Sequence, residues 1–408
     1  MVKKDRIEQH IKHLRKFTAT PGEGVTRLTY SVEDQSARTY LKAQMEAYGL
    51  VVREDSFGNV IGRLEGVKKD APVVMVGSHF DSVPNGGAYD GTAGVVVALE
   101  IAALFQAYRL KPVYPLEVVA FVEEEGSRFG GGLMGSRAMF GELSYEDFST
   151  LTDDRGTTTI EAMKTIGLHS PVAQTVYPHP LKAFLELHIE QGPVLEEANC
   201  SIGIVSGIVG LTTLEITVHG RAGHAGTTPM NRRADALVTA STIIASLPTL
   251  AQSVSEELVM TTGKLQVYPN GANVIPNKVV FSVDIRSSAT KEIEDAVEQL
   301  KILLEEQQGC QIEMETLMTV APTSMDQNMI DLLEKATKKQ SLSYCKMPSG
   351  AGHDAMILAK RTAAGMIFVP SKDGLSHCPE EFTATEDFVN GAAVLFETIQ
   401  QLTEAEQQ

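Results

Sequence analysis

One stretch, GSHFDSVPNGGAYDGTAG at residues 77–94, constrains the fold of this chain most strongly. An apolar, valine-rich run at residues 72–76 precedes it, as expected of a fully buried strand. A second apolar run, at residues 94–110, follows it and is long enough to form a buried helix. The stretch should therefore lie where a strand leaves an α/β sheet, which is where such sheets usually place their sites. Its candidate functional side chains are His79, Asp81 and Asp90.

Three later segments repeat this pattern of an apolar run that ends in reactive side chains. The segment at residues 115–132 carries three consecutive glutamates after its apolar run, and the segment at residues 181–192 ends in HIEQG. The segment AAGMIFVP is followed by SKDGLSHCPEEF. These three segments are therefore predicted to be strands of the same sheet that contribute to one site. The side chains they add are Glu123, Glu124, Glu125, His188, Glu190, Gln191 and His377.

Composition narrows the class of protein. A chain of 408 residues that is 43% hydrophobic can bury a large core and should form two or three domains. The formal net charge of -17 argues against nucleic acid or an anionic membrane surface as a partner. The four widely spaced cysteines form no CxxC pair, so free thiols are expected. The N-terminal segment lacks an apolar signal region and no apolar run of 18 residues follows, which favours a soluble, cytoplasmic protein.

The order of the predicted elements indicates two domains, one inserted into the other. Residues 212–323 read strand, helix, strand, strand, helix, strand, which is the order of a split βαβ, ferredoxin-like unit. The predicted domains are residues 1–211 and 325–408 for the first, with residues 212–324 as the insertion. In the first, a hairpin is expected around the Phe-Gly-Asn turn near residue 58, and helices and loops at 141–181. Further helices are predicted at Asp5–Phe17, Ser31–Tyr48 with Ser31 as N-cap, Gln327–Lys339 and Thr385–Leu402.

The strand-end side chains have the composition of a two-metal hydrolytic site. Two divalent ions that share one bridging carboxylate need about five protein ligands, and such ions lie roughly 3.5 to 4 Å apart. Asp90, on the tightest glycine loop, is the predicted bridge. The other predicted ligands are His79 and His188 for one ion, and Glu125 and His377 for the second.

The remaining carboxylates of these segments are predicted to have roles other than metal binding. Asp81, two residues from His79, suits an acceptor that fixes the imidazole tautomer. Glu124 is the candidate general base, because its neighbour Glu125 would be neutralised by a metal while Glu124 stays free to take a proton. Glu123 is expected to face away as a solvated or salt-bridged carboxylate. The other histidines are expected to be structural: His10, His13, His169, His179 and His219.

Seven motifs together resemble the carbamoylase and allantoate amidohydrolase branch of the dinuclear-metal aminoacylase and carboxypeptidase family. They are GSHFDSVPNGGAYDG, EEEGSRF, LELHIEQGPVLEE, GRAGHAGTTPMNRRAD, GANVIPN, GAGHDAM and DGLSHCPEE. The resemblance extends from GVTRL near residue 25 to the C-terminal helix. It implies a zinc-peptidase-like catalytic domain with a central mixed sheet flanked by helices, and an inserted α+β lid or dimerisation domain. It also implies two divalent ions per subunit, manganese or zinc with cobalt or nickel as further candidates, and a homodimer.

The resemblance further implies substrate contacts from the inserted domain. His224 and Asn273 would be presented by the partner subunit and would donate to the oxygen that becomes negative during the reaction. Arg286 is a forked donor suited to bidentate capture of a carboxylate, although alone it would suggest a surface ion pair. Gln191 could hydrogen-bond a ureido group. For His353 and Asp354, a structural role near the site and direct contact both stay open.

The activity that follows is hydrolysis of an N-carbamoyl-L-amino acid to the amino acid, ammonia and carbon dioxide. Glu124 would take a proton from metal-activated water and return it to the leaving nitrogen. Allantoate amidohydrolase is the nearest rival activity, but that branch carries Gln-Arg-Arg where this chain has Leu211, Thr212 and Thr213. An N-acyl-amino acid deacylase or dipeptidase, and a non-catalytic binding protein on the same scaffold, also stay open. Release of ammonia separates the first two activities from the deacylase or dipeptidase.

Overall fold

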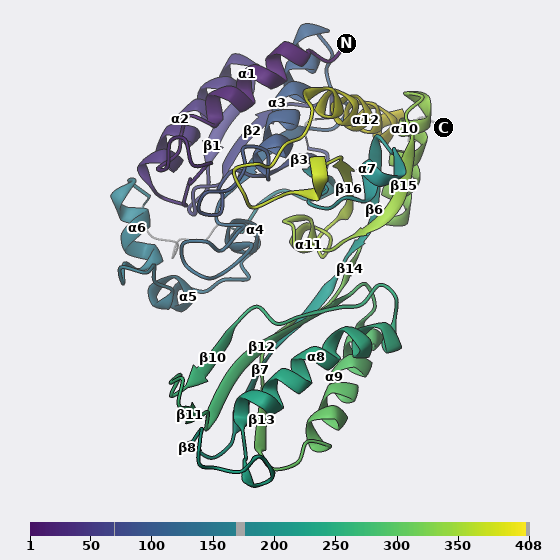
Figure 1. Ribbon diagram of the computed structural model, residues 1–408. Coiled ribbons are helices and arrows are strands. Elements are labelled where there is room, and N and C mark those ends of the chain that lie inside the picture. Colours follow the sequence, from purple (N-terminus) through teal and green to yellow (C-terminus); the bar gives the residue numbers. More distant parts are fainter. Residues whose placement is uncertain (69, 169–175, 405–408) are drawn as a thin grey trace. The chain divides into compact units, whose positions relative to one another are not determined.

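The computed structural model describes residues 1–68, 70–168 and 176–404. The chain divides into two compact units, which are described separately (Figure 1). Unit 1 comprises Met1–Ser206, Met325–Met347 and Gly352–Gln408. Unit 2 comprises Gly207–Ser324 and Pro348–Ala351, so most of it is inserted between two parts of unit 1.

The main sheet has nine strands in the order β1-β2-β4-β3-β5-β16-β6-β14, with β15 paired to β6. The central strands β4, β3, β5 and β16 are parallel, whereas β1, β2 and β6 pair antiparallel. The sheet is therefore mixed, as predicted. The bounds of its strands are β1 Val51–Glu54, β2 Val60–Leu64, β3 Val73–His79, β4 Leu116–Phe121, β5 Leu181–Ile189, β6 Ile202–Ile208, β14 Thr323–Ser324, β15 Tyr344–Ser349 and β16 Ala363–Val369.

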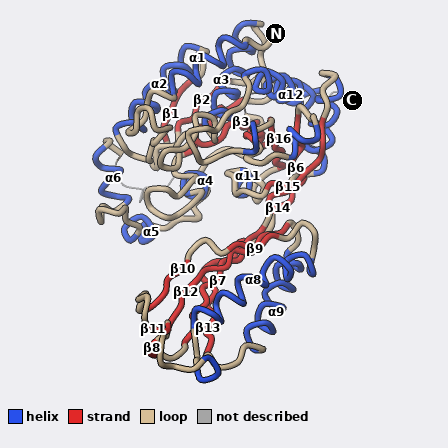
Figure 2. Tube along the Cα trace, viewed as in Figure 1, coloured by secondary structure: helices blue, strands red, loops and turns tan. Residues whose placement is uncertain are grey.

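Helices flank this sheet, as the distribution of helix and strand in Figure 2 shows. Helix α3 is buried from Thr92 to Phe105, and strand β3 is buried along its whole length, so both apolar runs have the predicted environment. Ser31 caps α2 by accepting a hydrogen bond from the amide of Asp34, also as predicted. The helices of unit 1 are α1 Lys4–Leu14, α2 Val32–Ala47, α3 Thr92–Ala107, α4 Met134–Met139, α5 Tyr145–Thr150, α6 Thr159–Thr165, α7 Val194–Ala198, α10 Gln327–Lys339, α11 Ala355–Leu358, the 3-10 helix η2 Lys372–Gly374 and α12 Thr385–Glu404.

Unit 2 contains an antiparallel sheet in the order β10-β12-β7-β13, the strand order of a ferredoxin-like fold. The single strand predicted between the first helix and the third strand is instead two strands, β9 and β10, which both pair with β12. Between the two paired segments, three residues of this chain segment (262–264) lie opposite two residues of β12 (282 and 283). The extra residue forms a bulge that interrupts the strand. The elements of unit 2 are β7 Gly210–His219, β8 Gly223–His224, η1 Met230–Arg232, α8 Ala236–Val254, β9 Val259–Thr261, β10 Leu265–Tyr268, β11 Val274–Ile275, β12 Lys278–Ser287, α9 Thr290–Glu305 and β13 Gln311–Val320.

Within the described ranges, α8 is the one helix long and apolar enough to cross a membrane by length and composition. Its fully buried residues follow a helical stripe that packs into the core of unit 2, as expected of a helix that covers a sheet. These residues are Ala236, Ala240, Ile243, Leu247 and Ala251.

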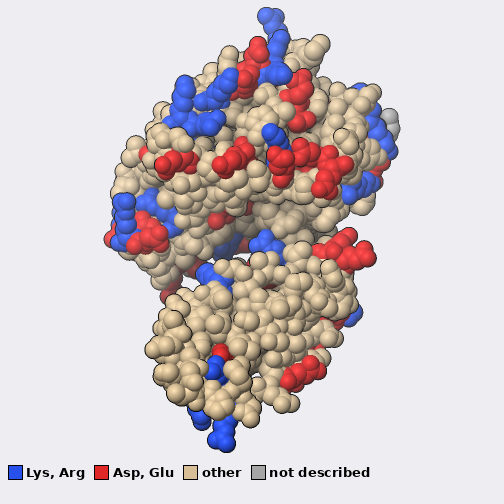
Figure 3. All heavy atoms as spheres, viewed as in Figure 1, with Lys and Arg blue, Asp and Glu red and all other residues tan. Residues whose placement is uncertain are grey.

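Figure 3 shows side chains of both charge signs on the face that it draws. Lys and Arg side chains adjoin one another near the upper left of this view, and a row of Asp and Glu side chains lies below them. The net charge of -17 argues against a polyanion such as nucleic acid as a partner.

His10 is a structural histidine, as predicted. Its ring is buried, with Nδ1 2.7 Å from the Tyr40 hydroxyl and Nε2 2.8 Å from the Tyr48 hydroxyl, so it joins α1 to α2. Burial, assisted by the positive charges of Arg6 and His13, lowers the pKa of His10 to about 4. Of the other histidines predicted to be structural, His169 lies outside the described residues.

This environment predicts a pH-dependent loss of stability. Because the unfolded chain binds a proton at His10 with a pKa near 6.5 and the folded chain at about 4, protonation favours unfolding as pH falls between these values. The stability advantage of the wild type over His10→Gln should therefore shrink as pH falls through this window, by up to about 3 kcal/mol. Urea unfolding at several pH values measures it. His179→Gln, which alters an exposed histidine of another segment, is the control, and an equal pH dependence in both variants would contradict the assignment.

Candidate metal centre

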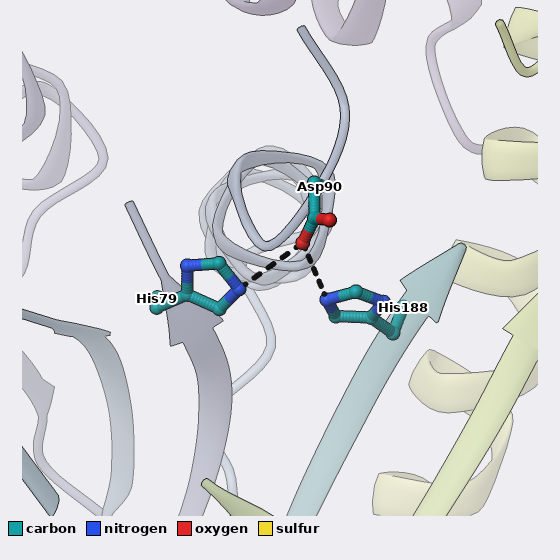
Figure 4. Close-up of side chains that lie close together, drawn as sticks. All are labelled: His79, Asp90 and His188. Atoms are coloured by element: carbon teal, nitrogen blue, oxygen red, sulfur yellow. Dashed lines mark ion pairs between the residues drawn. The ribbon is translucent and has the colours of Figure 1, made fainter. Parts of the chain in front are cut away.

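Two imidazoles from neighbouring parallel strands converge on one carboxylate oxygen. His79 is the last residue of β3, and His188 lies near the end of β5. Asp90 lies in the loop that leads from β3 into α3. Its Oδ1 is 3.3 Å from His79 Nε2 and 3.1 Å from His188 Nε2, and Figure 4 shows both rings directed at this oxygen. All three side chains are buried.

The second oxygen of Asp90 faces a different pair of side chains. Asp90 Oδ2 is 3.2 Å from His377 Nε2, and this nitrogen is 3.5 Å from Glu125 Oε2. Donor atoms of Asp90, Glu125 and His377 all lie within 4.8 Å of one another, as do those of His79, Asp90 and His188. The structure thus brings all five predicted ligands together, with Asp90 shared between the two groups.

The donors fit divalent metal ions. Imidazole and carboxylate without thiolate suit zinc, manganese, cobalt or nickel. Glu125 Oε1 is buried and has no hydrogen-bond partner among the described residues, so this acceptor is free to bind a cation. Burial and the charge of Asp90 raise the pKa of Glu125 to about 7, because a second buried carboxylate resists ionisation. A divalent cation would supply the missing positive charge.

Glu124 lies beside these donors with its carboxylate buried, and its Oε2 is 3.8 Å from His79 Nε2. Burial raises the pKa of Glu124 well above its usual range, and the charges of Asp354 and Glu125 add to the effect. A carboxyl group in this environment has the raised proton affinity that a general base requires.

Asp81 differs from its predicted role in detail. The atom nearest to His79 Nδ1 is the backbone carbonyl oxygen of Asp81, at 3.2 Å, whereas the carboxylate Oδ1 is 3.6 Å away. The carboxylate instead accepts hydrogen bonds from the backbone amides of Glu124 and Glu125, at 3.1 and 3.3 Å. The carbonyl therefore sets the imidazole tautomer, while the side chain holds the loop that carries both glutamates.

Glu123 faces away from the ligands, as predicted, but it is buried and forms no salt bridge with any described residue. Its side chain is buried, and Oε1 accepts hydrogen bonds from the backbone amides of Arg128 and Phe129. Glu123 has a positive φ of 50°, which turns the chain so that its side chain lies in the following loop. The sequence did not reveal this role because it depends on the path of the loop.

Gln191 lies against the shared carboxylate. Its Nε2 donates to Asp90 Oδ2 at 2.8 Å, and its Oε1 is buried without a hydrogen-bond partner in the described chain. The predicted contact with a substrate therefore remains a prediction, whereas the contact with Asp90 is a feature that sequence reasoning missed.

A second layer of buried side chains surrounds the histidines. The rings of His188 and His353 lie 4.5 Å apart, and His353 and Asp354 are both buried. Glu186, two residues before His188 on the same face of β5, accepts hydrogen bonds from Ser78 Oγ and the amide of Ala355. The alternation of side chains along a strand could have indicated Glu186.

Arg27 is a buried guanidinium that sequence reasoning passed over. It donates to the carbonyl oxygen of Phe80, between His79 and Asp81, at 2.6 Å and to the hydroxyl of Thr92 at 2.8 Å. Its remaining hydrogen bonds go to the carbonyl oxygens of Leu14 and Phe17. Arg27 therefore ties the end of β3 to the start of α3, the two segments that carry His79 and Asp90.

The predicted substrate contacts from the insertion all lie in unit 2, and they form two separate sets. His224 in β8 is paired with Val274 in β11, and the amide of Ala225 donates to the carbonyl of Asn273, so His224 and Asn273 are neighbours. Arg286 lies near the opposite end of β12, where its Nε donates to Asp284 Oδ1 at 2.7 Å.

A mixed α/β sheet with imidazoles and carboxylates at its parallel strand ends is the architecture of a metallopeptidase-like hydrolase. The model of peptidase family M20/M25/M40 matches residues 75–401. The chain belongs to this family, and the resemblance seen in its motifs is confirmed.

Similar proteins refine this assignment. The N-carbamoyl-L-amino-acid amidohydrolase of Paenarthrobacter aurescens is 40% identical over 403 residues, which cover 98% of both chains. The allantoate amidohydrolase of Escherichia coli (strain K12) is 38% identical over 399 residues, or 97% of both chains. A solved amidase of the hydantoinase/carbamoylase family from Burkholderia multivorans has a TM-score of 0.91 and 33% identity, with 98% of both chains covered.

The close packing of the Asp90 loop predicts that a methyl group added at Gly91 will disturb the metal site. A Cβ at Gly91 would fall on the His79 imidazole, whereas a Cβ at Gly130 would meet no atom within 4 Å. Both glycines have positive φ, so Gly91→Ala and Gly130→Ala should share a backbone cost of about 1 kcal/mol. Only Gly91→Ala should also displace His79 and reduce Mn²⁺ binding, measured by equilibrium dialysis. Equal Mn²⁺ binding by both variants would show that His79 is not held as a ligand.

Proposed function

We propose that this protein is a metal-dependent amidohydrolase that removes the carbamoyl group of N-carbamoyl-L-amino acids. The observation that carries the proposal is the Asp90 carboxylate, whose two oxygens face the His79–His188 pair and the Glu125–His377 pair. These five side chains would hold two divalent ions, manganese or zinc, with cobalt or nickel as further candidates. When bound, such ions polarise a carbonyl group and lower the pKa of water.

Glu124 supplies the proton transfer. Its buried carboxylate lies beside the metal ligands, and the raised pKa gives it the affinity to take a proton from the attacking water. The same carboxyl group then protonates the leaving nitrogen as the carbon–nitrogen bond breaks. Cleavage of this bond leaves a carbamate, which then decomposes with loss of carbon dioxide, so the products are the L-amino acid, ammonia and carbon dioxide.

The substrate class is supported by the relatives and by Arg286. Proteins named N-carbamoyl-L-amino-acid amidohydrolase are 40% identical to this chain. Arg286 presents a guanidinium that could bind the α-carboxylate of an amino acid through two parallel hydrogen bonds. Its hydrogen bonds to Asp284 and to the carbonyl oxygen of Gly350 would hold the guanidinium in place for this contact.

The geometry of unit 2 supports a homodimer with shared sites. Lys278 and Arg286 are separated by eight residues of β12, or roughly 27 Å at 3.4 Å per residue. His224 and Asn273 lie beyond the Lys278 end, because β11 ends at Ile275. One small substrate cannot contact both sets in a single chain, so we propose that His224 and Asn273 act on the substrate of the partner subunit.

We also propose a cytoplasmic location. Cys200, Cys310, Cys345 and Cys378 are free thiols, which suits a reducing compartment.

The substrate proposal is tested by ammonia release from N-carbamoyl-L-methionine and from allantoate, offered separately to the Mn²⁺-loaded protein. The carbamoyl amino acid should be turned over faster, because Leu211, Thr212 and Thr213 provide no cationic contact for the larger diureido substrate. Preference for allantoate would keep the chemistry and change the substrate. Activity only on N-acyl amino acids or dipeptides, without ammonia, would refute the proposal.

The shared site is tested by subunit complementation. Glu124→Gln should retain bound metal yet lose activity by about 10² to 10⁴-fold, since general base catalysis contributes that factor. His224→Ala should also be inactive. Mixed dimers of the two variants should regain activity, because one of their two sites combines an intact Glu124 with an intact His224. Mixed dimers verified by mass spectrometry that show no recovery would refute the shared site.

A further inference from the structure

Glu381 is a buried carboxylate close to the metal ligands that the proposed chemistry does not use. It lies four residues after His377, and its side chain is 4% exposed. Its Oε1 accepts hydrogen bonds from the backbone amides of Tyr89 and Asp90, at 3.0 and 3.2 Å. Its Oε2 accepts a hydrogen bond from Ser376 Oγ at 2.8 Å. Both oxygens are therefore occupied by donors of the protein.

These contacts join two loops that are distant in sequence. Glu381 is 291 residues from Asp90, and it follows the end of β16, whereas Asp90 follows the end of β3. Glu381 shares its loop with His377. The Glu381 carboxylate therefore joins two loops. One loop carries the shared ligand Asp90, and the other carries His377.

The close approach of the two loops depends on a glycine. A Cβ at Gly87 would overlap the carboxylate of Glu381, because Oε1 and Cδ of Glu381 occupy that position. Gly87 has no positive φ, so a larger residue is excluded there by the carboxylate and not by the backbone conformation. The sequence GGAYD therefore provides the space that Glu381 fills.

Ser376 connects Glu381 to the side chain of Asp90 as well. Its hydroxyl oxygen is 2.8 Å from Glu381 Oε2 and 3.1 Å from Asp90 Oδ2, and it has a single proton to donate. Glu381 provides the nearer acceptor. When Ser376 donates to Glu381, the Oδ2 of Asp90 keeps more of its negative charge for a cation.

We propose that Glu381 is a positioning residue that holds Asp90 and His377 at the spacing needed for the divalent ion between Asp90, Glu125 and His377. The inference rests on the proposed two-metal function. Glu381 does not bind the ion itself, since its oxygens accept hydrogen bonds from Tyr89, Asp90 and Ser376. It acts on this ion more than on the other, because the loops that Glu381 joins carry both Asp90 and His377, whereas of the three ligands of the other ion they carry only Asp90.

The test is a titration of the full-length, metal-free protein with Mn²⁺. Calorimetry and electron paramagnetic resonance monitor the binding. The wild type should take up two ions. Glu381→Gln removes the negative charge and can put an amide NH2 group in place of the oxygen that accepts the Ser376 hydrogen bond. One ion should therefore stay tightly bound, while the affinity for the other ion falls by about 10- to 100-fold. The kcat for the carbamoyl substrate should fall with the second ion, with little change in KM.

Glu380→Gln is the matched control. It removes the same charge one residue earlier, from an exposed side chain, and both ions should bind as in the wild type. Gly87→Ala is the second test variant, because it keeps the charge of Glu381 but puts a methyl group where the carboxylate lies. It should reproduce the selective loss of one ion, and it tests the inference if Glu381→Gln does not fold.

The outcomes separate the inference from the function on which it rests. Unchanged binding of both ions by Glu381→Gln, or equal weakening of both, would overturn the positioning role. A wild-type protein that takes up no Mn²⁺ would instead refute the proposed function. Reduced thermal stability of the metal-free variant with unchanged Mn²⁺ affinity would show that Glu381 serves the fold alone, and would also overturn the inference.

Discussion

The carboxylate of Asp90 is the interaction on which the site depends. One of its oxygens lies 3.1 to 3.3 Å from two imidazoles, and the other lies 3.2 Å from a third. No other described side chain belongs to both the His188 group and the His377 group of donors. Asp90 therefore links His188 to His377, while donor atoms of His79, Glu124 and Glu125, which also lie within 4.8 Å of one another, join the two pairs a second time.

The fold places Asp90 through several independent constraints. Strands β3, β5 and β16 are parallel, so the segments that carry His79, His188 and His377 all leave the sheet at the same edge. Arg27 fixes the end of β3 to the start of α3 from inside unit 1, and Glu381 holds the Asp90 loop through its backbone amides. The buried strands determine which residues can meet, and these two charged side chains set the detailed geometry.

This division explains how far the sequence alone could lead. The grouping of the five candidate metal ligands was predictable because their segments each follow an apolar strand, and parallel strand ends meet at one edge. The roles of Arg27 and Glu381 were not predictable, because most of their partners are backbone atoms up to 292 residues away, and no pattern of side chains records such contacts. The same limit applies to Asp81, whose carbonyl rather than carboxylate faces His79, and to the bulge that splits the predicted strand into β9 and β10.

The charge of the site favours a bound cation at these candidate ligands. Asp90, Glu124 and Glu125 place three carboxyl groups in a buried volume, and each ionised group in such a place costs several kcal/mol unless it is paired. The protein partly avoids the cost by protonation, since burial and neighbouring charge raise the pKa of Glu125 to about 7 and the pKa of Glu124 above its usual range. A divalent ion competes with these protons. Binding should therefore release protons and strengthen as pH rises, which couples the metal affinity of the site to the same electrostatics that give Glu124 its affinity for a proton.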